Sequence, residues 1–185
     1  MDPTGRVTVS SLTTANPNTP ATLQLYLDGN GNAFVVSMDA NDVTAGLAFQ
    51  QTAGASVSGS YAVTANGTTP FTTTDPVTGI KTTVIYSWAA VGLTSASNGT
   101  ATGFTDLNVL TNPQVTGTET ADVSLNGTSS GTGDILTGTI GGLGYLAGAN
   151  QYNYYVIDNN RVFAIETDAN QLSEAFAQSS TATTQ

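Results

Sequence analysis

Hydrophobic and polar residues alternate with a period of two along much of the chain. Val7 and Val9 alternate with polar neighbours, and so do Leu23, Leu25 and Leu27. This period is typical of a β-strand with one buried face. On this basis we predict strands at residues 5–12, 23–27, 33–38, 46–51, 61–63, 84–93, 103–109, 115–125 and 133–140.

Short runs of Asn, Asp, Gly and Pro separate these strands. Asn and Gly tolerate positive φ, so Asn-Gly and Asp-Gly pairs favour hairpin turns. Turns are expected at residues 15–20, 28–31, 39–42, 66–67, 98–99 and 126–127, with a Thr/Pro loop at 68–79 and a glycine-rich loop at 141–148. The longest apolar run, 84–93, contains the only tryptophan, Trp88, and is predicted to be a strand buried on both faces.

One stretch of the pattern occurs twice. Residues 23–50 align with residues 152–179 without a gap at an offset of 129, and seven of 28 positions are identical. The identical pairs are Tyr26/Tyr155, Asn30/Asn159, Phe34/Phe163, Asp39/Asp168, Ala40/Ala169, Asn41/Asn170 and Ala48/Ala177. A weaker match at an offset of 128 relates 5–12 to 133–140. The self-similarity predicts an internal repeat, with both phenylalanines buried and both aspartates, Asp39 and Asp168, in turns.

Residues 168–178 carry the one helical alternative. Asp168 and Gln171 fit a capping box, and apolar residues follow at helical spacing. The corresponding segment of the first copy contains Gly46 and β-branched residues, which are poor helix formers. A turn followed by a strand is therefore favoured in both copies.

These patterns predict an all-β fold, either an antiparallel β-sandwich or a barrel, with the internal repeat at an offset of 129. Residues 1–52 are expected to form a half-repeat, 53–179 a full β-domain and 180–185 a frayed tail. The repeated segment occurs twice but the middle segment, 55–127, only once. One copy is therefore expected to have exposed strand edges, which are templates for pairing with another chain.

The charge balance narrows the choice of partner. The 185 residues include 13 acidic and only three basic side chains, Arg6, Lys81 and Arg161, and the net charge is −10. This balance argues against nucleic acid and anionic membrane surfaces as partners. No apolar run is long enough for a membrane span, so membrane insertion is not expected.

The composition also limits the chemistry. The chain has no Cys and no His, which removes thiolate chemistry, the usual general base and the commonest metal ligand. Thr, Ser, Asn and Gly replace charged residues, as is common in secreted and cell-surface β-proteins. We therefore expect a secreted or cell-surface protein, with no cofactor.

The clearest metal motif is a D-x-N-x-N spacing formed by Asp28, Asn30 and Asn32. It matches the start of a calcium loop, with Asp39 at the twelfth position. The glycine expected at the sixth position is Ala33, and the second copy lacks the first aspartate. A hairpin turn explains the motif better, and no metal is predicted.

Three Asn-Gly-Thr sequons begin at Asn66, Asn98 and Asn126. Hairpin turns explain the same pairs without a sugar. Lys81, the only lysine, would need a buried acid beside it to form an isopeptide crosslink. Its position next to the Thr/Pro loop indicates exposure instead.

Four carboxylates are candidates for the acid pair of a glycosidase: Glu119, Glu166, Asp168 and Glu174. Only Glu166 and Asp168 fall on one side of an extended strand, and solvated turn acids explain them better. We predict no catalytic residue and no enzyme.

A cluster of aromatic residues is the best candidate binding site. Tyr145, Tyr152, Tyr154, Tyr155 and Trp88 would offer rings for stacking on a carbohydrate. Tyr152 and Tyr154 share one face of a strand, so Tyr152, Tyr154 and Trp88 are the candidate ligand-binding residues. Packing within the sheet is the alternative role for these side chains.

Several segments resemble the repeat unit of large secreted, Gly/Thr-rich bacterial β-proteins of unknown function. They are YAVTANG at 61–67, AVGLTSASNGTATGFTDLN at 90–108 and VFAIETDANQLSEAFAQ at 162–178. Gly103, Asp106 and Asn108 match a GxxDxN element, Gly5, Arg6 and Thr8 a GRGT-type strand, and Glu166, Thr167 and Asp168 an E-T-D turn. Val7 departs from the second motif, and Ser37 and Met38 depart from the third in the first copy. The resemblance implies one complete unit, about 55–179, preceded by the back half of another.

The sequence thus favours a non-catalytic structural module that acts through self-association, including growth into a filament, or through adhesion. The alternative is a β-domain that binds a carbohydrate or another small ligand.

Overall fold

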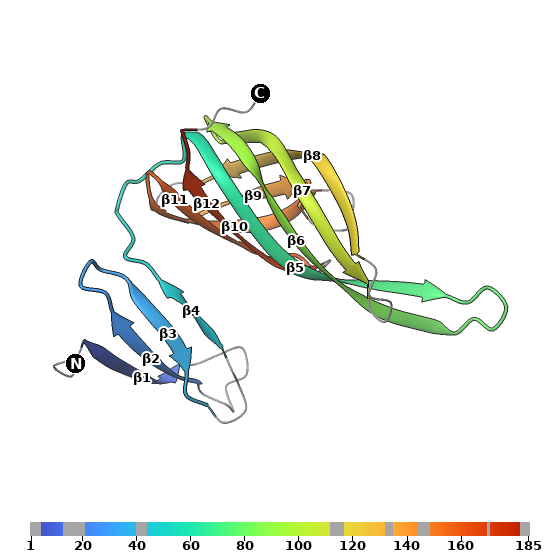
Figure 1. The fold of residues 1–185 in the computed structure, drawn as a ribbon, viewed down its shortest axis with the longest axis horizontal. Coiled ribbons are helices and arrows are strands. Elements are labelled where there is room, and N and C mark those ends of the chain that lie inside the picture. Colours follow the sequence, from blue (N-terminus) through green and yellow to red (C-terminus); the bar gives the residue numbers. More distant parts are fainter. Residues whose placement is uncertain are drawn as a thin grey trace. The chain divides into compact units, whose positions relative to one another are not determined.

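The computed structural model describes residues 5–12, 21–39, 44–111, 117–131, 135–143, 149–169 and 171–181. The chain divides into two compact units, residues 1–50 and 51–185. Both units consist of antiparallel strands, and the described residues contain no helix (Figure 1). The all-β prediction is confirmed.

The first unit is a four-stranded sheet in chain order. Its strands are β1 (Arg6–Leu12), β2 (Ala21–Leu27), β3 (Ala33–Ser37) and β4 (Ala45–Ala48). Across β2, β3 and β4, Tyr26 lies opposite Phe34, and Phe34 lies opposite Leu47. Among the described residues, β1 pairs only with β2 and β4 only with β3, so both are edge strands.

The second unit is an eight-stranded antiparallel sheet whose pairings form a ring. Its strands are β5 (Gly59–Thr74), β6 (Lys81–Ser97), β7 (Thr100–Thr111), β8 (Gly117–Ser130), β9 (Ile135–Gly141), β10 (Ala149–Asp158), β11 (Arg161–Glu166) and β12 (Leu172–Ser179). Each strand pairs with the next, and β12 returns to β5. Figure 1 shows that the end of β5 and the start of β6 extend beyond the ring as a long hairpin.

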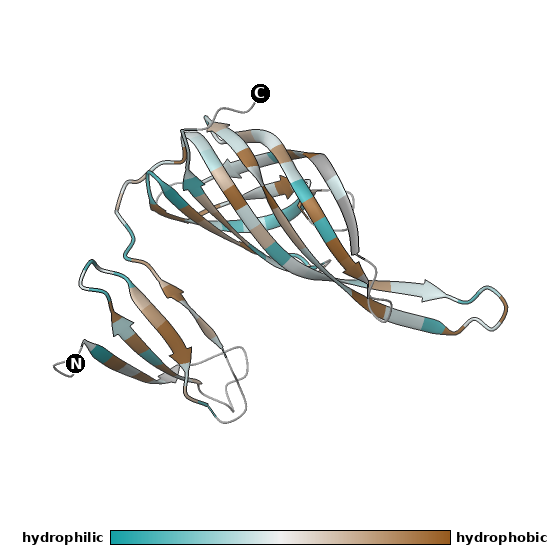
Figure 2. Ribbon diagram, viewed as in Figure 1, coloured by the Kyte–Doolittle hydropathy of each residue, from teal (hydrophilic) through white to brown (hydrophobic). Residues whose placement is uncertain are grey.

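The core of the second unit lies on the inner face of the ring. Its largest buried side chains include Tyr61, Trp88, Leu125, Tyr152 and Val156. Their neighbours on the same strands point outward, and Figure 2 shows apolar and polar positions alternating along the strands. The period of two in the sequence therefore places one set of side chains inside the ring.

Glycines allow adjacent strands of the ring to approach closely on this inner face. A Cβ atom added at Gly138 on β9 would meet the carbonyl oxygen of Thr128 on β8. A Cβ at Gly103 on β7 would meet the carbonyl oxygen of Leu93 on β6. Glycine within a strand commonly marks a bend or a close backbone approach, and such positions help a sheet to curve into a ring.

Several sequence predictions hold in the structure. Asn98 and Gly99 form the β6–β7 turn, where their φ values are 51° and 78°. Residues 28–31 connect β2 to β3, and residues 84–93 lie within β6. The segment 172–179 is strand β12 and not a helix, as the comparison of the two copies favoured.

Other local predictions are wrong. Asn66-Gly67 and Asn126-Gly127 lie inside β5 and β8, and β5 also runs through the predicted Thr/Pro loop as far as Thr74. Continuous pairing with a long neighbouring strand overrides the turn preference of these residues. The β6 segment is buried on one face only, because Trp88 is 4% exposed and Val91 is 57% exposed.

Phe34 and Phe163 both lie in strands, but the prediction that both are buried is wrong. Phe34 is 63% exposed, and Phe163 is half-buried. Phe163 lies between the inward-facing Val162 and Ala164 on β11, so its ring points away from the inner face. Asp168 lies in a bend after β11, and Asp39 is the second residue after the end of β3.

Some predictions concern residues outside the described ranges. These are the turn at 15–20, most of the turn at 39–42, most of the loop at 141–148 and most of the tail at 180–185.

We predict that Gly138→Ala destabilises the second unit by about 1–3 kcal/mol, because the new methyl group collides with the backbone of β8. Urea unfolding followed by the fluorescence of Trp88, the only tryptophan, measures this change. Thr137→Ala, at the exposed neighbouring position, is the control. Equal stability of the two variants would contradict the role of Gly138 in the close approach of β8 and β9.

Candidate functional site

The three candidate ligand-binding residues all lie on the inner face of the ring. Tyr152 is 1% exposed and Trp88 is 4% exposed, and Tyr154 is half-buried. The rings of Tyr152 and Tyr154 are 6.4 Å apart between centroids and inclined by 38°. The two tyrosines share one face, as their spacing predicts, but that face is the core. They therefore form no exposed platform for a sugar.

Trp88 is accommodated by a glycine on the neighbouring strand. Gly67 on β5 lies opposite Trp88 on β6 and opposite Ser173 on β12. A Cβ at Gly67 would lie 2.7 Å from Cζ2 of Trp88 and 2.6 Å from Cβ of Ser173. The indole thus occupies the space above Gly67 and reaches toward the polar residues of β12.

Those polar residues form a buried chain of hydrogen bonds. Ser173 donates its hydroxyl hydrogen to Oε2 of Glu166 at 2.7 Å, so the Tyr152 hydroxyl donates to Ser173 Oγ, also at 2.7 Å. The Gln171 amide donates weakly to Tyr152 and Ser173 at 3.5 Å, and its oxygen accepts a hydrogen bond from Thr69 at 3.1 Å. Four strands, β5, β10, β11 and β12, and the residue before β12 thus contribute to one polar cluster inside the ring.

The electrostatics of the cluster follow from its burial. Burial raises the pKa of Glu166 from its ordinary value of 4.5 to about 7, against the lowering effect of the Ser173 hydrogen bond. The nearby Asp168 raises this pKa further. Burial also raises the pKa of Tyr152 to about 12, and it raises the pKa of Tyr154. The cluster therefore favours neutral tyrosines near pH 7, and it favours a neutral Glu166 below about pH 7.

Three buried polar atoms of the ring have no hydrogen-bond partner among the described residues. They are Nε1 of Trp88, Nδ2 of Asn150 and Oε1 of Glu166. A buried donor or acceptor without a partner costs about 1–3 kcal/mol. These atoms are therefore the inner groups best suited to a small hydrogen-bonding molecule.

An apolar cavity of about 90 Å³ also lies inside the ring. Its walls include Tyr61, Val63, Leu125, Ile140, Tyr154 and Val162. The Tyr154 hydroxyl donates to the carbonyl oxygens of Thr128 and Thr139, at 3.2 Å and 3.0 Å. Because this hydroxyl already bonds to the backbone, it is not free to bond to a ligand. The walls are therefore mainly hydrophobic and do not suit a carbohydrate.

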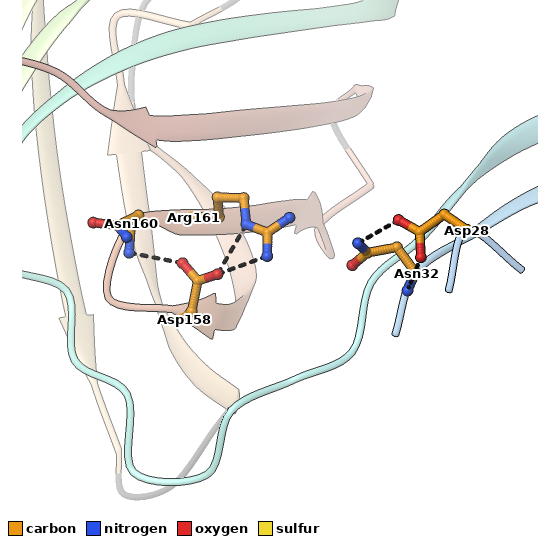
Figure 3. Close-up of polar contacts among 5 residues, drawn as sticks. All are labelled: Asp28, Asn32, Asp158, Asn160 and Arg161. Atoms are coloured by element: carbon orange, nitrogen blue, oxygen red, sulfur yellow. Dashed lines mark hydrogen bonds and ion pairs between the residues drawn. The ribbon is translucent and has the colours of Figure 1, made fainter. Parts of the chain in front are cut away.

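The calcium-like motif at Asp28 forms a turn stabilised by its own side chain. Oδ1 of Asp28 accepts hydrogen bonds from the backbone N–H groups of Asn30 and Asn32, and Oδ2 accepts one from the Asn32 amide (Figure 3). The Asn32 side chain and these N–H groups lower the pKa of Asp28. The described residues contain no group of three or more acidic side chains placed to hold a metal ion.

The β10–β11 turn of the second unit uses an aspartate in a related way. Oδ1 of Asp158 accepts from the N–H of Asn160 at 2.8 Å, and Oδ2 pairs with Arg161 at 2.7 Å (Figure 3). Burial would raise the pKa of Asp158, but the hydrogen bonds from Arg161 and Asn160 outweigh it and lower that pKa.

The four carboxylates considered for glycoside hydrolysis have different environments. Glu166 is buried in the polar cluster, and Asp168 accepts a hydrogen bond from the backbone N–H of Gln151 at 2.8 Å. Glu174 is exposed and contacts Asn66, and Glu119 lies on β8. Lys81 is exposed at the start of β6, as its position in the sequence indicates.

Sequence reasoning missed the chain from Tyr152 through Ser173 to Glu166. The signal was present in the alternation, since each of these residues occupies an inward position of its strand. A prediction that assigns only apolar residues to the core places polar residues on the outer face, even where they occupy inward positions. The consecutive pairing of β10, β11 and β12 brings the three together.

No family model, curated protein or solved structure matches the chain. Among the described residues, no helix has the length and apolar character required to cross a membrane.

We predict that the second unit loses stability as the pH rises from about 4.5 to about 7. Glu166 keeps its proton in the folded state over this range, whereas the unfolded chain has released it. Folding therefore requires proton uptake, which becomes unfavourable as pH rises, by roughly 3 kcal/mol over the whole range. Urea midpoints measured by Trp88 fluorescence across this range record the effect.

Glu166→Gln is expected to flatten this dependence, because the amide does not titrate. The exposed Glu174→Gln is the matched control and is expected to keep the wild-type profile. A Glu166→Gln profile identical to that of the wild type would refute the assignment.

Proposed function

We propose that strands β1–β4 and β9–β12 are two copies of one repeat at the offset of 129, and that the ring-like sheet is a β-barrel. The pairing registers support the repeat. Tyr26 lies opposite Phe34 in the first unit, and Tyr155 lies opposite Phe163 in the second. Val7 lies opposite Leu25, and Leu136 lies opposite Tyr154, so the registers relate β1 to β9 at an offset of 129 and not at the 128 of the sequence alignment.

Hydrogen bonds at the strand ends support the same relation. Oδ2 of Asp39 accepts from the N–H of Thr22 at 2.9 Å, and Oδ2 of Asp168 accepts from the N–H of Gln151 at 2.8 Å. In each case the aspartate follows the second strand of a hairpin and bonds to the start of the first strand. The two aspartates occupy corresponding positions in both alignment and structure.

The two copies differ in the strands that pair with their edges. In the second unit, β9 pairs with β8 and β12 pairs with β5. In the first unit, the corresponding strands β1 and β4 are edges among the described residues. The four strands of this sheet contain one charged residue, Arg6, and no proline, so little protects the edges from pairing.

These edges support a non-catalytic structural module that is secreted or exposed on the cell surface and assembles through strand pairing. Main-chain hydrogen bonds along an edge strand supply affinity, and the same edges can join copies of the chain or hold a target in adhesion. Head-to-tail pairing of this kind grows into a filament unless it closes. The two edges of the first unit, which pair with no further strand among the described residues, carry this proposal.

Sedimentation velocity across a wide concentration range tests it. The wild-type chain is expected to self-associate, and Gly46→Pro in β4 is expected to weaken association at least about 10-fold, since proline blocks an edge. Gly46→Ala is the matched control, because the space around that position is open. A wild-type chain that stays monomeric throughout would contradict assembly.

The inner cavity supports a second candidate function, the binding of a small ligand. The hydrophobic walls favour a small apolar molecule over a carbohydrate. The unpartnered atoms of Trp88, Asn150 and Glu166 do not line this cavity, so they contribute no polar group to its ligand.

Benzene serves as a probe for this candidate, since an engineered apolar cavity of about 150 Å³ binds it. Saturating benzene is expected to raise the urea midpoint of the wild type, because a ligand that binds only the folded state stabilises it. Ala96→Val, which fills part of the cavity, should reduce this response. No response in the wild type would count against ligand binding.

A further inference from the structure

We propose that the partner of the β1–β4 sheet is the β1–β4 sheet of a second copy, and that the two sheets close into an eight-stranded ring. This inference rests on the assembly function proposed above and specifies its partner. It replaces an open filament by a symmetric dimer. Four observations support it. The directions of the edge strands allow pairing, and the face that would become internal is apolar. The one charged side chain lies on the other face, and the strands of the second unit are already paired with one another.

The strand directions permit closure. The sheet has four strands in antiparallel succession, so β1 and β4 run in opposite directions. When two copies are related by a twofold axis along the ring, β4 of each copy meets β1 of the other in antiparallel orientation. Both edges of both copies are then paired, and the total of eight strands equals the number in the ring of the second unit. Such an isologous arrangement is the commonest in soluble homo-oligomers.

The face that would become the inside is apolar. Leu23, Leu25, Leu27, Ala33 and Val35 correspond, at the offset of 129, to Tyr152, Tyr154, Val156, Val162 and Ala164. The second set lies on the inner face of the existing ring, where it packs in the core. Leu25 also lies opposite Val7 and Val35, so the aliphatic face continues across three strands.

Closure would bury no charge on this face. Arg6 is the only charged residue in the four strands, and it lies opposite Tyr26 in the outward row. That row continues through Phe34 and Leu47, which are 63% and 60% exposed. Its counterparts in the second unit, Tyr155, Phe163 and Phe176, point outward from the ring and are half-buried. The outward row therefore stays outside in the dimer as well.

The main competing partner is the β5–β8 half of a second copy. In each chain, that half is already paired with β9 and β12, from Asn126 opposite Gly141 to Ser179 opposite Tyr61. An exchange would break both seams, whereas the β1–β4 sheets pair without disturbing the second unit. The observations therefore favour the second β1–β4 sheet.

The mass of the full chain and of two variants tests the proposal. Sedimentation equilibrium of the wild type is expected to give twice the 18.8 kDa mass of the chain, without further growth. Leu25→Asp places a carboxylate on the inner face, and it is expected to weaken the dimer about 100-fold or more, since an unpaired charge resists burial. Tyr26→Asp, on the outer face of the same strand, is the control and is expected to remain a dimer. Trp88 fluorescence verifies that the second unit is folded in each variant.

A double-cysteine variant separates the proposal from exchange of β5–β8. Asn66 and Glu174 lie opposite one another on β5 and β12, and the chain has no other cysteine. An oxidised Asn66→Cys/Glu174→Cys chain is locked against exchange and is expected to dimerise as the wild type does. Loss of the dimer on oxidation, with its return on reduction, would overturn the proposal in favour of exchange.

A monomeric wild type would overturn both this inference and the assembly function. Mass that grows without limit, or a Leu25→Asp variant that associates like the wild type, would overturn the closed ring and leave strand-mediated assembly standing. Dissociation by Tyr26→Asp as well as Leu25→Asp would also overturn it, because the outer face would then be part of the contact.

Discussion

The pairing of strand edges is the constraint on which the structure depends. Each edge strand presents a row of N–H and C=O groups that needs partners in water or in protein. The second unit meets this requirement internally, because its eight strands form a ring and β12 pairs with β5. The first unit is a four-stranded sheet whose edge strands, β1 and β4, pair with no further strand among the described residues. The difference between the two units motivates the proposed function.

Close packing inside the ring sets the second constraint. Glycines at Gly67 and Gly138 make room for Trp88 and for the backbone of β8. The buried chain from Tyr152 to Glu166 stabilises the junction of β10, β11 and β12, because each of its hydroxyl groups has a partner. Such a network specifies the packing of a core when all of its members are bonded, and Oε1 of Glu166 is the exception within it.

The sequence predicts the parts of this fold that depend on local pattern. Alternation at Leu23, Leu25 and Leu27 identifies a strand, and Asn98-Gly99 identifies a turn that requires positive φ. Prediction fails where distant strands decide the outcome. Asn66-Gly67 has the composition of a turn, but pairing with both β6 and β12 keeps it extended. The inward positions of Tyr152 and Trp88 likewise follow from ring closure, which joins residues more than a hundred positions apart, such as Tyr61 and Ser179.

Amide hydrogen exchange of β1 and β4 tests the central claim most directly, because it reports whether their edge groups are paired. The measurement compares these strands at high and low protein concentration, with β5 and β12 as internal references whose edges are paired within the chain. The account predicts that protection of β1 and β4 rises with concentration while that of β5 and β12 stays constant. Strong protection of β1 and β4 that does not depend on concentration would show that their edges are satisfied within a single chain, and it would contradict the account.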